Sequence, residues 1–242
     1  MIDLHNHIIY GIDDGAKDIE ESIEMAKAAQ ATGVDKIIAT PHYKTNSFMS
    51  DKEEILHKIE TLNQQLQNLN IEVEVKGGQE IHIEPYTLDY LEKGQLLSLA
   101  DSQYYFLIEP PFKGFPDFIE TTIDGFIQEG LQPVIAHPER NDYIRRHPEV
   151  LDELVKQGCL LQMNAASILG DYGPFIEKTA QYMIENKKFH LIGSDAHNCN
   201  NRVFCIDQCY ERINDEAFQN YIKANAEKVW KGNKKIDNMQ YF

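Results

Sequence analysis

One unit recurs along this chain: a helical stretch ends at a glycine, and a short apolar run follows that finishes in polar residues. Residues 24–33 followed by 34–42 form one copy, and residues 151–158 followed by 159–167 form another. Glycine just past a helix adopts the left-handed conformation that other residues avoid. The glycines expected to end helices are Gly33, Gly130 and Gly158. Helices that alternate with buried strands predict a parallel α/β fold.

Seven apolar runs have the length and composition of buried parallel strands. They are residues 2–4, 36–40, 71–75 together with 80–83, 104–109, 133–137, 160–164 and 190–195. The last long stretch, residues 214–230, predicts an amphipathic closing helix.

Helix starts are also marked in the sequence. Residues 18–21 have capping-box spacing, as does Ser50 placed three residues before Glu53. Pro148 and Pro174 suit the first turns of two further helices. These signals place helices between the expected strands.

Almost every expected strand carries His, Asp or Glu at its C-terminal end. An open sheet gathers its functional residues mainly at one switch point, whereas a parallel barrel assembles its site from the ends of several strands. The distribution therefore favours an α/β fold that is an irregular TIM-like barrel of seven strands. The sequence has no linker rich in Pro, Gly or Ser, so we expect one domain over residues 1–242.

Six motifs at these strand ends contain groups that bind metal ions. The candidate ligands are His5, His7, Asp14, His42, Glu80, Glu109, His137, Asp195 and His197. Any one of them could be a core histidine or a helix cap, but their shared position is difficult to explain by packing. Nitrogen and carboxylate donors without thiolates favour Mn²⁺, Fe²⁺, Zn²⁺ or Co²⁺. Nine ligands exceed the needs of one ion, so two or three ions are expected, with a bridging hydroxide as nucleophile.

The formal net charge is −16, from 23 basic and 39 acidic residues. This charge disfavours binding to nucleic acid or to an anionic membrane. The N-terminus lacks a signal-peptide pattern and no apolar run has the length of a membrane span, so a cytoplasmic location without membrane insertion is expected. An anionic substrate must then be attracted by local positive charge. Two of the five arginines, Arg140 and Arg202, lie close to the metal motifs.

The motifs resemble those of a known superfamily. HxH, the following DDG, TPH, the central glutamate, AHPER and SDAH together resemble the PHP (polymerase and histidinol phosphatase) superfamily. The segments MIDLHNHI…GIDDG, ATPHY and GSDAHN more closely resemble its bacterial manganese-dependent protein-tyrosine phosphatases, which regulate capsule and exopolysaccharide synthesis. The resemblance spans nearly the whole chain and implies a single PHP-type domain, a (β/α)7 barrel and a centre of three Mn²⁺ ions.

The resemblance also implies how the ligands are shared among the ions. His5, His7, Glu80 and Asp195 would hold one ion; Glu80, Glu109 and His137 a second; and Asp14, His42 and His197 the third. Asp13 is an alternative to Asp14 by one residue, and we expect Asp14 to be the ligand and Asp13 a capping or supporting group.

Roles for the substrate-binding residues follow from the same resemblance. Arg140 and Arg202 would bind the phosphate and stabilise its oxygens during catalysis, because a guanidinium group matches phosphate geometry. Independently of the resemblance, the aromatic residues Tyr10, Tyr43 and Phe112 are expected to form the wall of the pocket and to stack on the substrate ring. The implied substrate is a phosphotyrosine-containing protein, the tail of a bacterial tyrosine kinase.

Three alternatives were weighed. A phosphatase with a cysteine nucleophile needs a C-x5-R loop, and no cysteine here has arginine six positions later. Cys199, Cys205 and Cys209 are read as ordinary reduced thiols. A small-molecule phosphatase of the histidinol-phosphate type would use the same chemistry on another substrate. A non-catalytic metal-binding protein is the third alternative, and the complete set of ligands argues against it.

Overall fold

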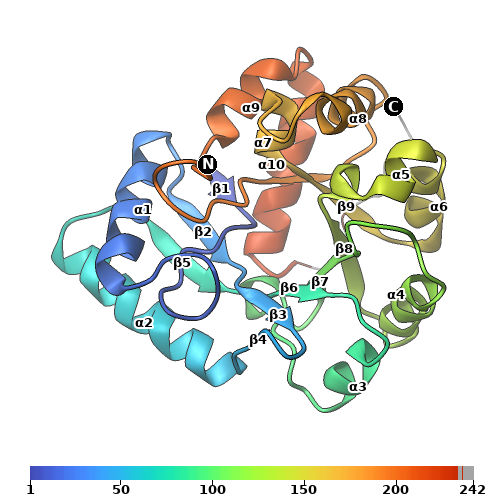
Figure 1. Cartoon of the computed structure of the whole chain (residues 1–242). Helices are drawn as coiled ribbons and strands as arrows, with labels where there is room; N and C mark the ends of the chain where they lie inside the picture. The colour runs from blue at the N-terminus through green and yellow to red at the C-terminus, as the bar shows by residue number, and fades with distance from the viewer. Residues whose placement is uncertain (234–235, 237–242) are drawn as a thin grey trace.

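The computed structural model describes residues 1–233 and 236, and it consists of short central strands surrounded by helices (Figure 1). The strands are β1 (Ile2–Asp3), β2 (Lys36–Ala39), β3 (His42–Lys44), β4 (Phe48–Met49), β5 (Glu74–Gly77), β6 (Glu80–His82), β7 (Tyr105–Glu109), β8 (Gln132–Ala136), β9 (Leu160–Asn164) and β10 (Leu191–Gly193). The helices are α1 (Ile19–Ala31), α2 (Lys52–Asn68), α3 (Thr87–Glu92), α4 (Phe118–Gln128), α5 (Asp142–Arg146), α6 (Val150–Gln157), α7 (Ala165–Leu169), α8 (Pro174–Glu185), α9 (Ile206–Arg212) and α10 (Glu216–Trp230). Two 3-10 turns are η1 (Leu99–Asp101) and η2 (Pro138–Arg140).

Strand pairing closes into a barrel with seven strand positions. They are occupied in order by β1, β2 continued by β3, β5 continued by β6, β7, β8, β9 and β10. These neighbours pair in parallel, and β4 adds an antiparallel pair to β3. A bridge between Asn6 and Ala196 joins the two ends of the ring, where the His7 amide donates to the Ala196 carbonyl at 2.8 Å. The prediction of an irregular seven-stranded α/β barrel is confirmed.

The run predicted as residues 71–75 with 80–83 forms two strands, in two different sheets. Gly77 ends β5 and Gly78 follows it, and at both positions a Cβ atom would come within 3.1 Å of packed leucine or isoleucine side chains. Two strand positions of the barrel change partners at their middle in this way. As a consequence, His42 and Glu80 begin the short strands β3 and β6. The expectation that they end strands is therefore wrong.

Most predicted helix ends are confirmed. Asp18 caps α1 by accepting the Glu21 amide. The three expected glycines lie just past α1, α4 and α6 with positive φ: Gly33 at 81°, Gly130 at 72° and Gly158 at 112°. Pro174 is the first residue of α8, and the closing helix is α10.

Two helix starts were predicted wrongly. Asp51 and not Ser50 caps α2, because the Asp51 carboxylate accepts the Glu54 amide at 2.7 Å. Pro148 lies ahead of α6, which begins at Val150 with Glu149 as its cap residue. In both cases the predicted helix start is displaced by one or two residues. A Ser-Asp or Pro-Glu pair offers two adjacent start signals, and the sequence does not decide between them.

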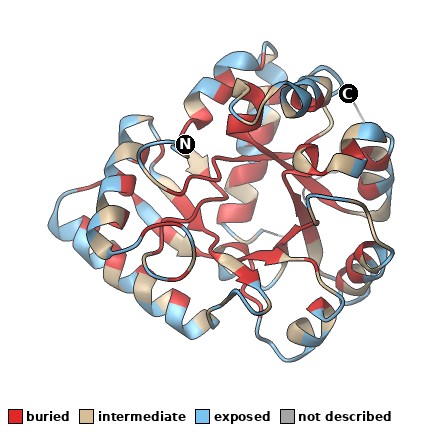
Figure 2. Cartoon of the chain, in the orientation of Figure 1, coloured by how far each residue is buried: buried red, intermediate tan, exposed pale blue. Residues whose placement is uncertain are grey.

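The interior of the barrel is apolar and one end is covered. Leu107, Val134 and Leu191 point inward and pack with Val229 and Trp230 of α10. The Lys36 ammonium group, at the start of β2, lies 5.9 Å from the Trp230 ring. The helix therefore covers the end where the strands begin. Figure 2 shows the central strands buried and the outer faces of the helices exposed, which leaves the C-terminal ends of the strands for a site.

Across residues 1–233 and 236, no helix combines the length and apolar character that a membrane span requires.

The corrected cap of α2 gives a test of the fold. We expect Asp51→Ala to lower the free energy of unfolding by about 1 kcal/mol, because the helix loses the acceptor for a free amide. The matched change Ser50→Ala is expected to cost less than about 0.5 kcal/mol. Urea unfolding measures both values, and equal losses would contradict the assignment of the cap.

His190 gives a second test, in pH dependence. Burial lowers the pKa of His190 to about 4, and its Nδ1 accepts the Leu161 amide at 3.0 Å. The unfolded pKa is about 6.5. Because the folded pKa is depressed, this histidine contributes stability above pH 6.5 that is lost as the pH falls toward 4.

We expect His190→Asn, whose side-chain oxygen can still accept the amide, to lose less stability than the wild type between pH 7 and 4. The difference should approach about 3 kcal/mol. Urea unfolding at several pH values measures it, and parallel curves for the two proteins would contradict the buried neutral histidine.

Candidate metal centre

The structure brings all nine predicted ligands together at the C-terminal mouth of the barrel. Glu80, the first residue of β6, is 1% exposed and lies at the middle of the group. Its oxygens lie 2.8 Å from His42 Nδ1 and 2.8 Å from His137 Nε2. They lie 3.2 Å from His5 Nε2 and 3.4 Å from His7 Nε2. Four imidazoles from three separate segments therefore face one carboxylate.

A first group consists of residues that follow β1 and β10. Asp195 Oδ1 lies 3.6 Å from His5 Nε2 and 3.3 Å from His7 Nε2. Together with Glu80, these residues have donor atoms within 4.8 Å of one another, and all are buried. The bridge that closes the barrel lies between these two segments and holds them side by side.

A second group lies toward solvent. Asp14 Oδ1 lies 3.5 Å from His42 Nε2 and 3.4 Å from His197 Nε2. His7 also approaches this group closely enough to share an ion. The Asp14 side chain is 53% exposed, so this is the most open part of the cluster.

The third group includes Glu109 at the end of β7. Glu109 Oε1 lies 3.7 Å from His137 Nε2, which also faces Glu80. His42 also belongs to this group, because one donor atom each of His42, Glu80 and Glu109 lies within 4.8 Å of the other two. His82 Nδ1 forms a 2.8 Å hydrogen bond with Glu109 Oε2 and orients that carboxylate.

Several buried polar atoms in this cluster have no hydrogen-bond partner among the described residues. They are the Nε2 atoms of His5, His7 and His197. A buried polar atom without a partner is costly and is rare in native proteins. All of these atoms point into the cluster and belong to types that bind divalent cations. The residues present therefore fit bound metal ions.

Charge in the cluster is arranged to keep the carboxylates ionised. Burial alone raises the pKa of Glu80, but the adjacent His5 and His42 side chains lower that pKa well below its usual range. The pKa of Asp195 is also strongly lowered: burial alone raises it, but the adjacent His7 imidazole, 3.3 Å away, together with His5 and Arg202 outweighs that effect. Ionised carboxylates are the form that binds a cation.

Asp13 and Asp14 have different surroundings. Asp13 Oδ2 forms a 2.6 Å hydrogen bond with His7 Nδ1 and accepts the His42 amide at 2.9 Å. Its Oδ1 accepts the Gly15 amide at 3.0 Å. Asp13 is thus fully engaged in holding His7 with Nε2 toward the cluster, while Asp14 faces His42 and His197. This geometry favours Asp14 as the ligand and Asp13 as its support.

Other supporting residues were not identified from the sequence. Asp3 accepts hydrogen bonds from the His5 amide and from both the amide and the hydroxyl of Ser194. Gln162 Oε1 lies 3.0 Å from His5 Nδ1. Asp3 lies two residues before His5 on an extended segment, so alternation could have revealed it. Gln162 lies within a buried strand, and no local signal marks it.

Two candidate ligands have backbone conformations that non-glycine residues rarely adopt. His137 has φ of 29° and Asp195 has φ of 55°. Such conformations cost of order 1 kcal/mol each and concentrate at functional sites. In both cases the chain turns sharply at the end of a strand, and this turn directs the side chain toward Glu80 and His5.

The two predicted arginines meet above the cluster. Arg140 Nη1 and Arg202 Nη2 each lie 2.7 Å from the same atom, Asp195 Oδ2. The Arg140 guanidinium lies between two rings, 4.7 Å from Phe112 and 4.5 Å from Tyr172. The pair is therefore held in place and directed at the mouth.

A cavity of about 230 Å³ lies over the cluster. Its lining includes Arg140, Arg202, Phe48, Phe112 and Lys44, besides Asp14, His42, Glu80, His82, Glu109, His137 and Asp195. Phe48 stacks on His42 with ring centroids 5.7 Å apart, and Phe112 stacks on His137 at 6.0 Å. Two aromatic rings therefore flank a cavity floor that carries both cationic and anionic side chains. Phe48, on the unpredicted strand β4, was missed.

The predicted roles of Tyr10 and Tyr43 as pocket walls are corrected by the structure. Tyr43 follows His42 on β3 and faces the opposite side, where it is 4% exposed and packs on Tyr90 in the core. The ring of Tyr10 lies 5.1 Å from the Lys58 ammonium group and packs against the core beside α1 and α2. Phe112 lines the cavity as expected.

A parallel barrel with buried histidines and carboxylates at its C-terminal mouth defines a class of protein, the metal-dependent hydrolases of TIM-like fold. The family profile "Capsular polysaccharide synthesis, CpsB/CapC" matches residues 1–231, and the chain belongs to this family.

Similarity to named relatives and to a solved structure is consistent with membership of this family. The chain is 40% identical over 204 residues to tyrosine-protein phosphatase YwqE of Bacillus subtilis, covering 84% of this chain and 80% of the relative. It is 31% identical over 218 residues to tyrosine-protein phosphatase CpsB of Streptococcus pneumoniae, covering 88% and 89%.

A solved chain from the crystal structures of YwqE from Bacillus subtilis and CpsB from Streptococcus pneumoniae, described as "unique metal-dependent tyrosine phosphatases", superposes with a TM-score of 0.92 at 36% identity. It covers 99% of this chain and 97% of the other. This agrees with the resemblance inferred from the motifs.

Metal binding gives the test of this site. We expect Mn²⁺ to raise the thermal midpoint of chelator-treated protein, because a ligand that binds only the folded state adds about 2.7 kcal/mol at a hundredfold excess over its Kd. Glu80→Gln should lose most of this stabilisation and bind fewer ions, measured by elemental analysis.

Glu139→Gln is the matched control. Glu139 is equally buried at the mouth, and Gln can still accept the Asn164 amide that Glu139 Oε1 accepts at 3.0 Å. The control should retain the metal content of the wild type. A Glu80→Gln protein with the full complement of ions would contradict the central place given to Glu80.

Proposed function

We propose that this chain is a metal-dependent protein-tyrosine phosphatase whose catalytic unit is the whole chain, residues 1–242. The observation that carries this proposal is one cavity that combines a His/carboxylate cluster, two guanidinium groups and two flanking aromatic rings. The cluster suits divalent cations, the arginines suit a phosphate, and the rings suit a phenyl group. The family and its named relatives support the same activity.

The proposed metal ligands are the nine residues at the C-terminal mouth of the barrel. The proposed cofactor is a set of three Mn²⁺ ions. His5, His7, Glu80 and Asp195 form one set; Glu80, Glu109 and His137 a second; and Asp14, His42 and His197 a third. The distances among these donors support the three sets, with Glu80 shared between the first two. Fe²⁺, Co²⁺ and Zn²⁺ accept the same donors, so their supply decides which ion binds.

When bound, divalent ions activate water and neutralise the charge on a phosphate group. The residues of the chain then bind and orient the substrate. Arg140 and Arg202 exchange part of their contact with Asp195 for the phosphate oxygens, where charge-assisted hydrogen bonds are strong. Phe48 and Phe112 hold the phenyl ring between them. A phenol with a pKa of about 10 leaves readily, so strong help from a general acid is not required.

The four cysteines are unsuited to nucleophilic catalysis. Cys159, Cys205 and Cys209 are buried, and burial raises the pKa of Cys205 to about 12. Burial also raises the pKa of the exposed Cys199. A catalytic cysteine needs a lowered pKa, since the thiolate is the nucleophile. The other alternative, a small-molecule phosphatase of the histidinol-phosphate type, is not favoured by relatives that are named tyrosine phosphatases.

The proposed substrate is a phosphotyrosine-containing segment of a bacterial tyrosine kinase that acts in capsule or exopolysaccharide synthesis. The family description supports the capsule context. A cytoplasmic kinase tail and a cytoplasmic phosphatase would meet in one compartment, and we propose that location for this chain.

Arginine variants test the proposed function. We expect Arg140→Ala and Arg202→Ala each to lower kcat/KM on p-nitrophenyl phosphate and on a phosphotyrosine peptide by about 10²–10³, because each removes a cation that binds the reacting phosphate. Arg212→Ala, on the exposed face of α9, serves as the control and should retain wild-type rates.

Phosphate release measured with added Mn²⁺ gives these rates, and a chelator should abolish them. Full turnover in metal-stripped protein, or unchanged rates in both arginine variants, would overturn the proposed function. Faster turnover of histidinol phosphate than of the peptide would move the assignment to the small-molecule alternative.

A further inference from the structure

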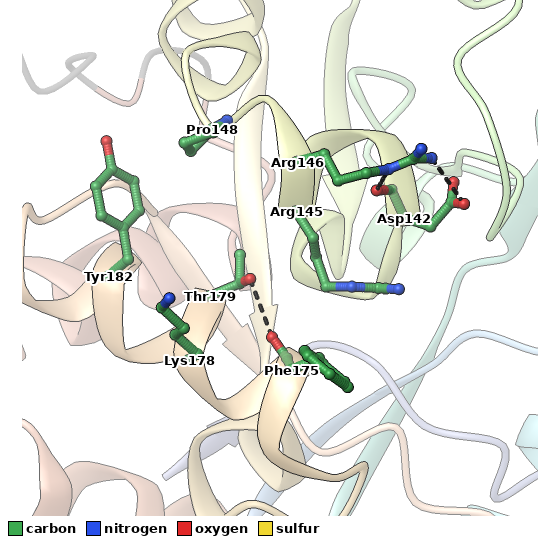
Figure 3. Close-up of a pocket in the computed structure, with 8 residues that line it drawn as sticks. All are labelled: Asp142, Arg145, Arg146, Pro148, Phe175, Lys178, Thr179 and Tyr182. Carbon is green, nitrogen blue, oxygen red and sulfur yellow. Dashed lines mark hydrogen bonds and ion pairs between the residues drawn. The ribbon is translucent and has the colours of Figure 1, made fainter.

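A second hollow, of about 540 Å³, lies outside the metal centre between α5 and α8 (Figure 3). On the α5 side it is lined by Arg145 and Arg146. Arg146 Nη2 pairs with Asp142 Oδ2 at 2.9 Å, and Asp142 also accepts the Gly114 amide. Arg145 donates through Nη1 to the carbonyl of Arg140 at 2.5 Å.

The α8 side supplies one cation and two rings. Lys178 and Tyr182 lie one turn apart on this helix and line the hollow together with Phe175 (Figure 3). Phe175 is 80% exposed. An isolated exposed phenylalanine is common, but here it borders a hollow with three cations, where it is positioned to contact a bound ring.

The charge of this hollow is opposite to that of the whole chain. Its lining carries three cations and one carboxylate, a formal charge of +2, in a chain of −16. The carboxylate is directed at Arg146. Arg145 contacts a neutral carbonyl, so the three cations of the lining together keep a net charge of +2 that attracts an anion. Together with the two arginines of the metal centre, four of the five arginines of the sequence lie at the two cavities.

A hydrogen bond links the linings of the two cavities. Arg140 of η2 lines the metal-site cavity, and its carbonyl accepts the hydrogen bond from Arg145 of the hollow. Tyr172, whose ring lies 4.5 Å from the Arg140 guanidinium, lies two residues before Pro174, the first residue of α8. A polypeptide with one side chain in the metal centre can therefore cross η2 and place another in the hollow.

We propose that the hollow between α5 and α8 binds a second phosphotyrosine of the polypeptide whose first phosphotyrosine occupies the metal centre. This inference rests on the proposed function. Arg145, Arg146 and Lys178 bind the phosphate, since arginine forks and ammonium groups match its oxygens. Phe175 and Tyr182 contact the phenyl ring. Engagement of both sites raises affinity without new contacts at the centre, because the second binding event is intramolecular.

Peptides with one or two phosphotyrosines test this inference. The doubly phosphorylated set varies the spacing from one to eight residues. At the best spacing we expect wild-type KM for the doubly phosphorylated peptide to be about tenfold lower than for the singly phosphorylated one. Lys178→Glu and Arg146→Ala should abolish this advantage, while kcat/KM on p-nitrophenyl phosphate stays at the wild-type value.

Lys156→Glu is the matched control, with the same charge change at an exposed lysine of α6. It should keep the full advantage, which separates local binding from general electrostatic steering. A wild-type protein without preference at any spacing, or a Lys178→Glu protein that keeps the preference, would overturn the second site.

Binding of uncleavable peptides separates this inference from the proposed function. Peptides with phosphonomethylphenylalanine in place of phosphotyrosine are titrated by calorimetry into the purified protein. The doubly substituted peptide should bind the wild type and Lys156→Glu about tenfold more tightly than the singly substituted peptide does. Lys178→Glu should bind the two peptides with equal affinity. Absence of turnover together with this binding pattern would reject the phosphatase activity and retain the site, and equal binding in all three proteins would reject the site.

Discussion

Crowding of buried charge at the mouth of the barrel is the constraint on which the rest of the structure depends. Glu80 and Asp195 are almost fully buried and ionised, and four histidines and two arginines surround them. Like charges this close are unfavourable unless cations lie between them. The supporting hydrogen bonds of Asp3, Asp13 and Gln162 fix the histidines in the orientations that make a shared cation possible. The fold thus holds together groups that would otherwise repel one another.

Closure of the barrel and assembly of the centre are the same structural event. The first strand is only two residues long, and its continuation through Asn6 pairs with Ala196 near the end of the chain. This pairing places the HxH segment beside the SDAH segment, which are about 190 positions apart in the sequence. A barrel that failed to close would leave His5 and Asp195 apart, so the metal centre can be complete only when the barrel is closed.

Much of the fold and of the site could be predicted from the sequence, because both leave local signals. Glycines after helices, apolar runs and the polar residues that follow them are all visible in the local sequence. The motifs contain all nine residues of the cluster, although His42 and Glu80 begin strands in the structure. Three kinds of feature could not be predicted from the sequence. The split of residues 71–83 into two strands depends on leucines packed against Gly77 and Gly78. The direction of Tyr43 depends on which face of β3 meets the core, and the places of Phe48 and Gln162 depend on contacts between distant segments.

Asp195 Oδ2 is shared by both arginines, each at 2.7 Å, and this has a consequence for the end of the reaction cycle. An arginine pair that is already partly neutralised by a carboxylate holds a phosphate ion less tightly than a free pair would, because the carboxylate competes for the same hydrogens. Inorganic phosphate is both the product and an abundant cellular anion. If the arginines bind the phosphate as proposed, this internal carboxylate would return them to their resting pair, favour departure of the product and limit inhibition by phosphate from the surroundings.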